Sequence, residues 1–122
     1  MMSMVCVGYA NESPWQYVET VKGNRDIYIN PNSIKSYSQV PYDYVKCQVK
    51  INNNNNAIYE LCSIIINKDT KDWASVVWEK YSSDDKLTYR SVSQALAWNR
   101  YEDGIFQKAI DTILELEQKG SK

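Results

Sequence analysis

The chain has 122 residues, a net charge of −1 and no histidine. This length suits one domain with a single core. The nearly balanced charge leaves no basic stripe of the kind that binds nucleic acid, so we expect no nucleic-acid partner. The lack of histidine removes the commonest metal ligand and the usual general base, which argues against histidine-dependent catalysis.

The first ten residues, Met1–Ala10, carry no charge and are followed by polar, turn-forming residues. Gly8 and Ala10 supply the small-x-small pattern of a signal-peptidase site. We therefore interpret residues 1–10 as the tail of a secretory signal, which would remove Cys6, and residues 11–122 as a single α+β domain. The alternative is a hydrophobic first strand. No other stretch is long and apolar enough to be expected to span a membrane.

Alternation of apolar and polar residues predicts strands along most of the chain. The expected strands are 15–21, 26–30, 42–51, 57–66, 72–82 and 87–92. A single helical turn is expected at Ile34–Lys35. Ser36–Pro41 is predicted to be a polar connection, because Pro41 cannot donate to a ladder. The segment Ala97–Asn99 could be a short edge strand or part of a loop.

The pattern becomes helical near the C-terminus, at residues 103–119. Apolar residues there recur at three- and four-residue spacing, at Ile105, Phe106, Ala109, Ile110, Ile113, Leu114 and Leu116. Asp103 suits an N-cap and Gly120 a C-terminal cap. The sequence therefore predicts an α+β fold, with a mostly antiparallel β-sheet of about five or six strands and a C-terminal α-helix packed on one face.

Two cysteines, Cys47 and Cys62, flank the asparagine run Asn52–Asn56. If Asn53–Asn56 form a four-residue hairpin loop, Cys47 lies directly opposite Cys62. A disulfide is then possible, and it would agree with an oxidising, extracytoplasmic compartment.

A five-residue loop would give a different result, because Cys47 would then face Leu61. The two cysteines would point to opposite faces and stay as separate thiols. Both alternatives remain open from the sequence. Two cysteines without histidine make a poor zinc site, and their spacing is not that of a Cys-x-x-Cys redox motif.

No other motif points to catalysis, a metal or a cofactor. The adjacent acids Asp84/Asp85 and Glu102/Asp103 are typical of turns and helix starts, whereas a glycosidase needs two acids facing each other across a cleft. The glycines are isolated, so no phosphate-binding loop is present. We therefore expect a protein that is not an enzyme and binds no cofactor.

Aromatic residues are plentiful, with ten tyrosines and four tryptophans. Several could form a platform that binds a sugar or a peptide, although core and cross-strand packing is the commoner use of such residues. The residues concerned are Trp15, Tyr17, Tyr28, Tyr44, Trp73, Trp78, Tyr81, Tyr89 and Trp98.

The order of these signals resembles the bacterial surface-adhesin protein E-like family. The matching segments are Trp15–Val18, Tyr28–Lys35, Val45–Ile51 and Trp78–Lys86, with Trp98 leading into the helix. The resemblance implies a small exported domain with two β-hairpins, a C-terminal helix and adhesion to host matrix proteins.

The chain also departs from that family. Asn67 stands near the place of one family cysteine, the helix has no cysteine, and Asn30 replaces the usual aspartate. No binding residue can be carried over from the family. We expect an exported cell-envelope or secreted domain that binds an unknown protein partner. The alternative is an envelope component that self-associates as a homodimer.

Overall fold

The structure is a computed structural model that describes residues 14–120. The predicted signal segment Met1–Ala10, with Cys6, lies outside the described residues. The strands are β1 (Gln16–Val21), β2 (Arg25–Ile29), β3 (Lys35–Gln39), β4 (Tyr42–Asn53), β5 (Tyr59–Asn67), β6 (Trp73–Tyr81) and β7 (Leu87–Val92). A 3-10 turn, η2 (Pro31–Ser33), precedes β3, and the helix α1 (Gln107–Gly120) ends the described chain.

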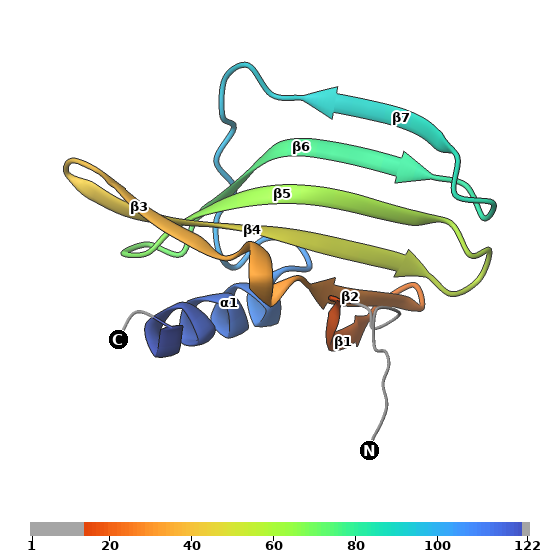
Figure 1. The fold of residues 1–122 in the computed structure, drawn as a ribbon, viewed down its shortest axis with the longest axis horizontal. Coiled ribbons are helices and arrows are strands. Elements are labelled where there is room, and N and C mark those ends of the chain that lie inside the picture. The colour runs from red at the N-terminus through yellow and green to blue at the C-terminus, as the bar shows by residue number, and fades with distance from the viewer. Residues whose placement is uncertain (1–13, 121–122) are drawn as a thin grey trace, which may run out of the picture.

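The strands form one antiparallel sheet in the order β1-β2-β4-β5-β6-β7, with β3 as an additional partner of β4 (Figure 1). Six strands follow the main path and one helix packs on the sheet, which confirms the predicted α+β class. β2 and β3 share the same edge of β4: β2 pairs with its C-terminal half and β3 with its N-terminal half. Together they act as one strand that η2 interrupts.

The interruption between β2 and β3 differs from the one predicted from the sequence. Its helical turn is at Pro31–Ser33 instead of Ile34–Lys35, because Asn30 caps Asn32 N–H at 3.0 Å and Pro31 fixes the first helical position. The predicted connection at Ser36–Pro41 is wrong, since Lys35–Gln39 is a strand. Its pairing with β4 outweighs its low strand propensity.

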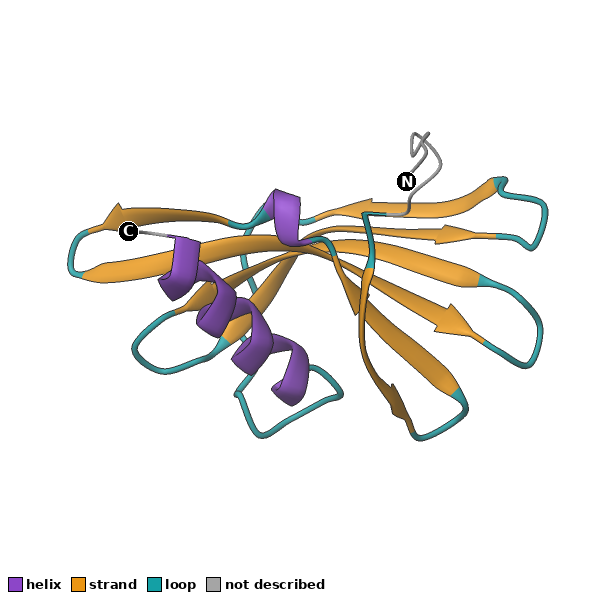
Figure 2. Ribbon diagram, turned by 60° about the horizontal axis from the view of Figure 1, so that its bottom comes forward, coloured by secondary structure: helices purple, strands orange, loops and turns teal. Residues whose placement is uncertain are grey.

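The helix α1 packs on one face of the sheet as predicted, over β1, β2 and β4 (Figure 2). Its stripe Ala109, Ile110 and Ile113 is fully buried, and each such side chain contributes about 1.5–3 kcal/mol, alanine less. The predicted start at Asp103 is wrong. Asp103 N–H donates to Arg100 O in a turn, and Gly104 has a φ of 89°.

The two faces of the sheet differ sharply, as β4 illustrates. Val45, Cys47, Val49 and Ile51 are buried under α1, on what we call the helix face. Tyr44, Lys46, Gln48 and Lys50 alternate with them on the open face. Within residues 14–120 no helix covers the open face (Figure 2).

The asparagine run forms an ordered loop between β4 and β5. Asn53 N–H donates to Ile58 O at 2.8 Å, so the four loop residues are Asn54–Ala57, one position later than predicted. Asn54 and Asn55 donate to Asn24 and Gly23 in the β1–β2 turn. The loop is therefore held by side-chain hydrogen bonds to its neighbour.

The segment around Ala97–Asn99 forms no strand. Asn99 makes a single bridge to Trp73, with backbone N···O distances of 3.0 and 2.7 Å in the two directions. This bridge fixes the connection between β7 and α1 and brings Trp98 to the end of the sheet.

Candidate binding surface

The two cysteines lie in the core of the helix face and are free thiols. The register places Cys47 opposite Ile64 and Cys62 opposite Val49, so the predicted opposition of Cys47 and Cys62 is wrong. The physical reason is the position of the loop. The loop starts one residue later than predicted, so each residue of β4 faces a residue of β5 two positions further on. The cysteines therefore share a face, as the four-residue loop requires, without opposing each other.

The surroundings of the thiols make them unreactive. Each is 2% exposed, and burial raises the pKa of both. Cys47 Sγ lies 3.6 Å from the carbonyl oxygen of Asn30 and 3.4 Å from that of Gln48. A nucleophilic cysteine needs the opposite setting, with a thiolate favoured by nearby positive charge.

The two carboxylate pairs lie on exposed turns and have local partners. Asp85, in the β6–β7 turn, accepts a hydrogen bond from Tyr59 Oη at 2.8 Å, and Asp84 lies 3.8 Å from Lys86 Nζ. Glu102 lies 3.4 Å from Arg100 Nε in the connection to α1. None of these contacts within residues 14–120 is with another acid. They are the contacts of turn formation and solvation.

The predicted aromatic platform is split over both faces of the sheet. Trp73 and Trp78 pack on Phe106 on the helix face, with ring centroids 4.8 and 6.3 Å away. Trp15 and Tyr81 lie on the open face, and Tyr17 packs edge-on against Tyr28 at 5.7 Å. Tyr89 lies beside Lys80 at the β7 edge. The nine residues thus make no single platform.

A smaller aromatic cluster forms at the end of the sheet, where the β3–β4 hairpin meets the connection to α1. We call Tyr37, Tyr42, Tyr44 and Trp98 the aromatic end cluster. Tyr44 is its centre, 5.4 Å from Tyr37 and 5.8 Å from Trp98 in stacked arrangements, and 6.3 Å from Tyr42 edge-on. Only Tyr44 and Trp98 had been singled out from the sequence.

The aromatic end cluster is open to solvent. Tyr37, Tyr42 and Trp98 are 37%, 44% and 42% exposed. With Val40 and Leu96 they line a groove of about 370 Å³. Burial and the neighbouring Tyr44 raise the pKa of Tyr37, so this ring keeps its proton at neutral pH. Stacked, half-exposed aromatic rings beside apolar side chains are typical of the core of a binding interface.

A second aromatic group lies near the other end of the open face. Tyr59 and Tyr81 stack with centroids 5.0 Å apart. Lys50 Nζ lies 4.8 Å from the Tyr59 ring and 5.9 Å from the Trp15 ring. These residues satisfy one another, which favours a structural role: the lysine joins the N-terminal part of the chain to the sheet.

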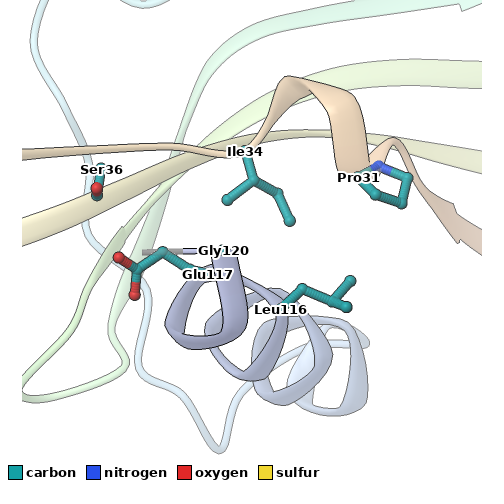
Figure 3. Close-up of a pocket in the computed structure, with 6 residues that line it drawn as sticks. All are labelled: Pro31, Ile34, Ser36, Leu116, Glu117 and Gly120. Atoms are coloured by element: carbon teal, nitrogen blue, oxygen red, sulfur yellow. The ribbon is translucent and has the colours of Figure 1, made fainter. Parts of the chain in front are cut away.

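A pocket on the helix face separates α1 from the start of β3 (Figure 3). Ile34 and Leu116 supply apolar walls, and Glu117 is 8% exposed. Lys68 Nζ lies 3.1 Å from Glu117 Oε1 in ion-pair contact, without hydrogen-bond geometry. The positive charge of Lys68 compensates the buried carboxylate of Glu117. The contact also links the last turn of α1 to the β5–β6 turn. The contact is explained by helix docking.

Residues 14–120 contain no group of three or more side chains that could hold a metal ion. No helix in the same part of the chain has the length and apolar character needed to cross a membrane.

Comparison of the chain with protein families, with curated proteins and with solved structures found no matching family, no matching curated protein and no matching structure. The resemblance to the surface-adhesin protein E-like family therefore stays a prediction from the sequence.

Proposed function

We propose that this chain is an exported, non-enzymatic domain of the cell envelope that acts by binding another protein, in an adhesin-like way. The observation that carries the proposal is the aromatic end cluster. Its rings stack with Tyr44 at the centre while Tyr42 and Trp98 stay more than 40% exposed. Such a patch costs solubility in a free domain and becomes favourable when a partner covers it.

Other features of the chain support the remaining parts of the proposal. A binding role agrees with carboxylate pairs that serve turns and with thiols that are buried. Export agrees with the uncharged, small-residue-ended segment Met1–Ala10. Export is tested with a reporter enzyme that is active only in an oxidising compartment. The reporter is fused to the C-terminus, and the fusion is expressed in a bacterial host from the natural gene with its upstream DNA. Reporter activity is expected, and an inactive fusion contradicts the proposed localisation.

Binding is tested with purified full-length chain and a panel of immobilised matrix proteins, including collagen, fibronectin and laminin. Wild type is expected to bind at least one of them. The double variant Tyr37→Ser/Trp98→Ser should lose binding by about tenfold or more, since two anchoring rings are removed. Tyr17→Ser is the control, because Tyr17 is 53% exposed but lies away from the aromatic end cluster. Equal binding by all variants, or no binding to any protein of the panel, contradicts the proposal.

A homodimer is a second candidate, favoured by the edge strand β7. Among residues 14–120 this strand pairs only with β6, and its Leu87, Tyr89 and Val92 are each about half exposed. Unpaired strand edges readily pair with a second copy. Sedimentation of the full chain decides: a dimer that Leu87→Lys dissociates supports this candidate, and a monomer at high concentration contradicts it.

A further inference from the structure

A polar pocket of about 320 Å³ lies on the open face, beside η2 and the first residues of β3. Its polar lining consists of Asn32, Ser33, Lys35, Lys46, Gln48 and Ser63. No carboxylate lines it, although the chain carries slightly more acids than bases. We call this the basic pocket. Neither the predicted disulfide nor the proposed aromatic contact accounts for it.

The two lysines of the basic pocket are directly opposed. Lys35 pairs with Lys46 in the β3–β4 ladder, so their side chains leave the same face about 5 Å apart at Cβ. Both are exposed. Like charges in this position repel, and a bound anion between them would offset the repulsion.

Five other lysines of the chain have partners, whereas Lys22, Lys108 and Lys119 stand exposed and apart from one another. Lys68, Lys71 and Lys86 each lie within 4 Å of a carboxylate. Lys50 and Lys80 lie over tyrosine rings. Within residues 14–120, Lys35 and Lys46 have neither kind of contact. The pocket therefore concentrates positive charge that the described chain does not neutralise.

The floor of the basic pocket is held in place by hydrogen bonds. Ser33 Oγ accepts from Gln48 N–H at 2.8 Å and donates to Asn30 O at 2.7 Å. Asn30 Nδ2 donates to Gln48 Oε1 at 3.3 Å, which leaves the Gln48 amide nitrogen available as a donor. Asn32 contributes a second side-chain amide. Two ammonium groups and two amides form a donor set, which suits an acceptor-rich anion.

The neighbouring residues indicate where such an anion would come from. The next row on the same ladder is Tyr37 opposite Tyr44, so the basic pocket adjoins the aromatic end cluster. β3 pairs only with β4 among residues 14–120, and its five residues are exposed. An extended segment alongside β3 would place alternate side chains about 7 Å apart, beside Lys35 and then beside Tyr37.

We propose that the basic pocket is the carboxylate-binding subsite of the binding surface. It holds an aspartate or glutamate of the partner protein, whose extended segment pairs with the free edge of β3 and places an aromatic residue two positions on at the aromatic end cluster. The inference rests on the proposed protein-binding function and names the chemistry of the partner: an acidic, aromatic-containing segment in extended conformation.

The test uses the full-length chain labelled with nitrogen-15 and a synthetic peptide of alternating glutamate and tyrosine. The expected result is a set of amide shifts confined to β3, η2 and β4, centred on Lys35, Tyr37 and Lys46. The same peptide with glutamine for glutamate should bind about tenfold more weakly, since charge-assisted contacts are lost. Affinity for the glutamate peptide should also fall with added salt.

Variants separate the subsite from general charge effects. Lys35→Gln/Lys46→Gln should weaken binding of the glutamate peptide about tenfold. Lys35→Arg/Lys46→Arg should retain this binding. Lys22→Gln/Lys108→Gln is the control, because it removes the same charge from exposed lysines elsewhere. An unchanged circular dichroism spectrum and unfolding midpoint show that a variant is folded.

Three results overturn the subsite. The glutamine peptide binds as tightly as the glutamate peptide, the amide shifts lie away from Lys35 and Lys46, or a sulfated disaccharide displaces the peptide and binds more tightly. The last would reassign the pocket to sulfated glycans. Peptide binding that depends on Trp98 but not on the two lysines leaves the proposed function standing and removes the subsite alone.

Discussion

Lys35 lies opposite Lys46 on the open face, and within residues 14–120 no carboxylate lies within ion-pair distance of either ammonium group. Cross-strand neighbours of like charge destabilise a sheet. The pair sits next to the aromatic end cluster, which exposes rings that folding alone would bury. Two unfavourable features side by side indicate a surface shaped for contact with something else, at some cost to the stability of the free domain.

Replacement of Lys46 by glutamine should therefore stabilise the free protein. Removing one of the opposed charges is expected to raise the free energy of unfolding by about 0.2–1 kcal/mol, with the aliphatic stem largely kept. Urea unfolding at low salt measures the free energy of unfolding of the variant and of wild type. Added salt should make the two values more similar, because it screens the repulsion in the wild type. Lys108→Gln is the control and should leave stability almost unchanged. A loss of stability in Lys46→Gln would contradict a repulsive pair.

The two core thiols give a second prediction. Both should resist alkylation in the native protein and react fully once it is unfolded, because burial keeps them protonated and out of reach. Cys62→Ala should cost about 0.5–1.5 kcal/mol, the scale of one deleted core group. Cys62→Ser should cost more, since a hydroxyl would be buried among apolar groups.

Intact mass of the non-reduced protein checks the state of these thiols. The free-thiol mass is expected. In protein that lacks Cys6, a mass lower by two hydrogens would mean that Cys47 and Cys62 are bridged, which requires the β4–β5 register to differ from the one described.

The fold class, all the described strands except β3 and the helix stripe could be predicted because each depends on local periodicity. Periodicity does not account for Glu60, which stands on an apolar face. Trp78, on the neighbouring strand β6, donates a hydrogen bond from Nε1 to Glu60 Oε1 at 2.5 Å. β3 was missed because its polar sequence becomes a strand only through pairing with β4. The helix start was misplaced because the turn at Gly104 sends Phe106 against Trp73.

The candidate binding surface was less predictable than the fold. Tyr44 and Trp98 are more than fifty positions apart in the sequence and meet only because Asn99 bridges to Trp73. Tyr37 became visible only once β3 was a strand. The basic pocket depends on the β3–β4 register as well. A contact between distant segments has no signal in residue spacing, so only the tertiary structure brings these groups together.

Ala57 offers a test of the asparagine loop. It has a φ of 60°, a left-handed conformation that costs most residues roughly 1 kcal/mol, and glycine adopts it freely. Ala57→Gly is therefore expected to stabilise the protein, by less than about 1 kcal/mol because glycine also loses more entropy on folding. Ala97→Gly, at a position with ordinary φ, is the control and should be neutral or destabilising. Thermal unfolding of the two variants compares them, and a destabilised Ala57→Gly would mean that the loop has another shape.

The raised pKa of Tyr59 predicts how the stability of the fold depends on pH in the alkaline range. Burial and then the hydrogen bond to Asp85 raise the pKa of Tyr59 to about 12, from an ordinary value of 10.0. The folded state therefore holds this proton more tightly than the unfolded state. The resulting stability is fully present below pH 10 and is lost as the pH rises from 10 towards 12.

Tyr59→Phe should remove part of this alkaline loss. Phenylalanine keeps the stacking on Tyr81 but has no proton to lose and no bond to Asp85, so the variant should be less stable than wild type at pH 8 and closer to it at pH 11. Urea unfolding at the two pH values measures the convergence. Tyrosinate absorbance should show one fewer late-titrating group in the variant. Tyr17→Phe is the matched control, with an exposed ring. A constant stability difference across this range would contradict a raised pKa at Tyr59.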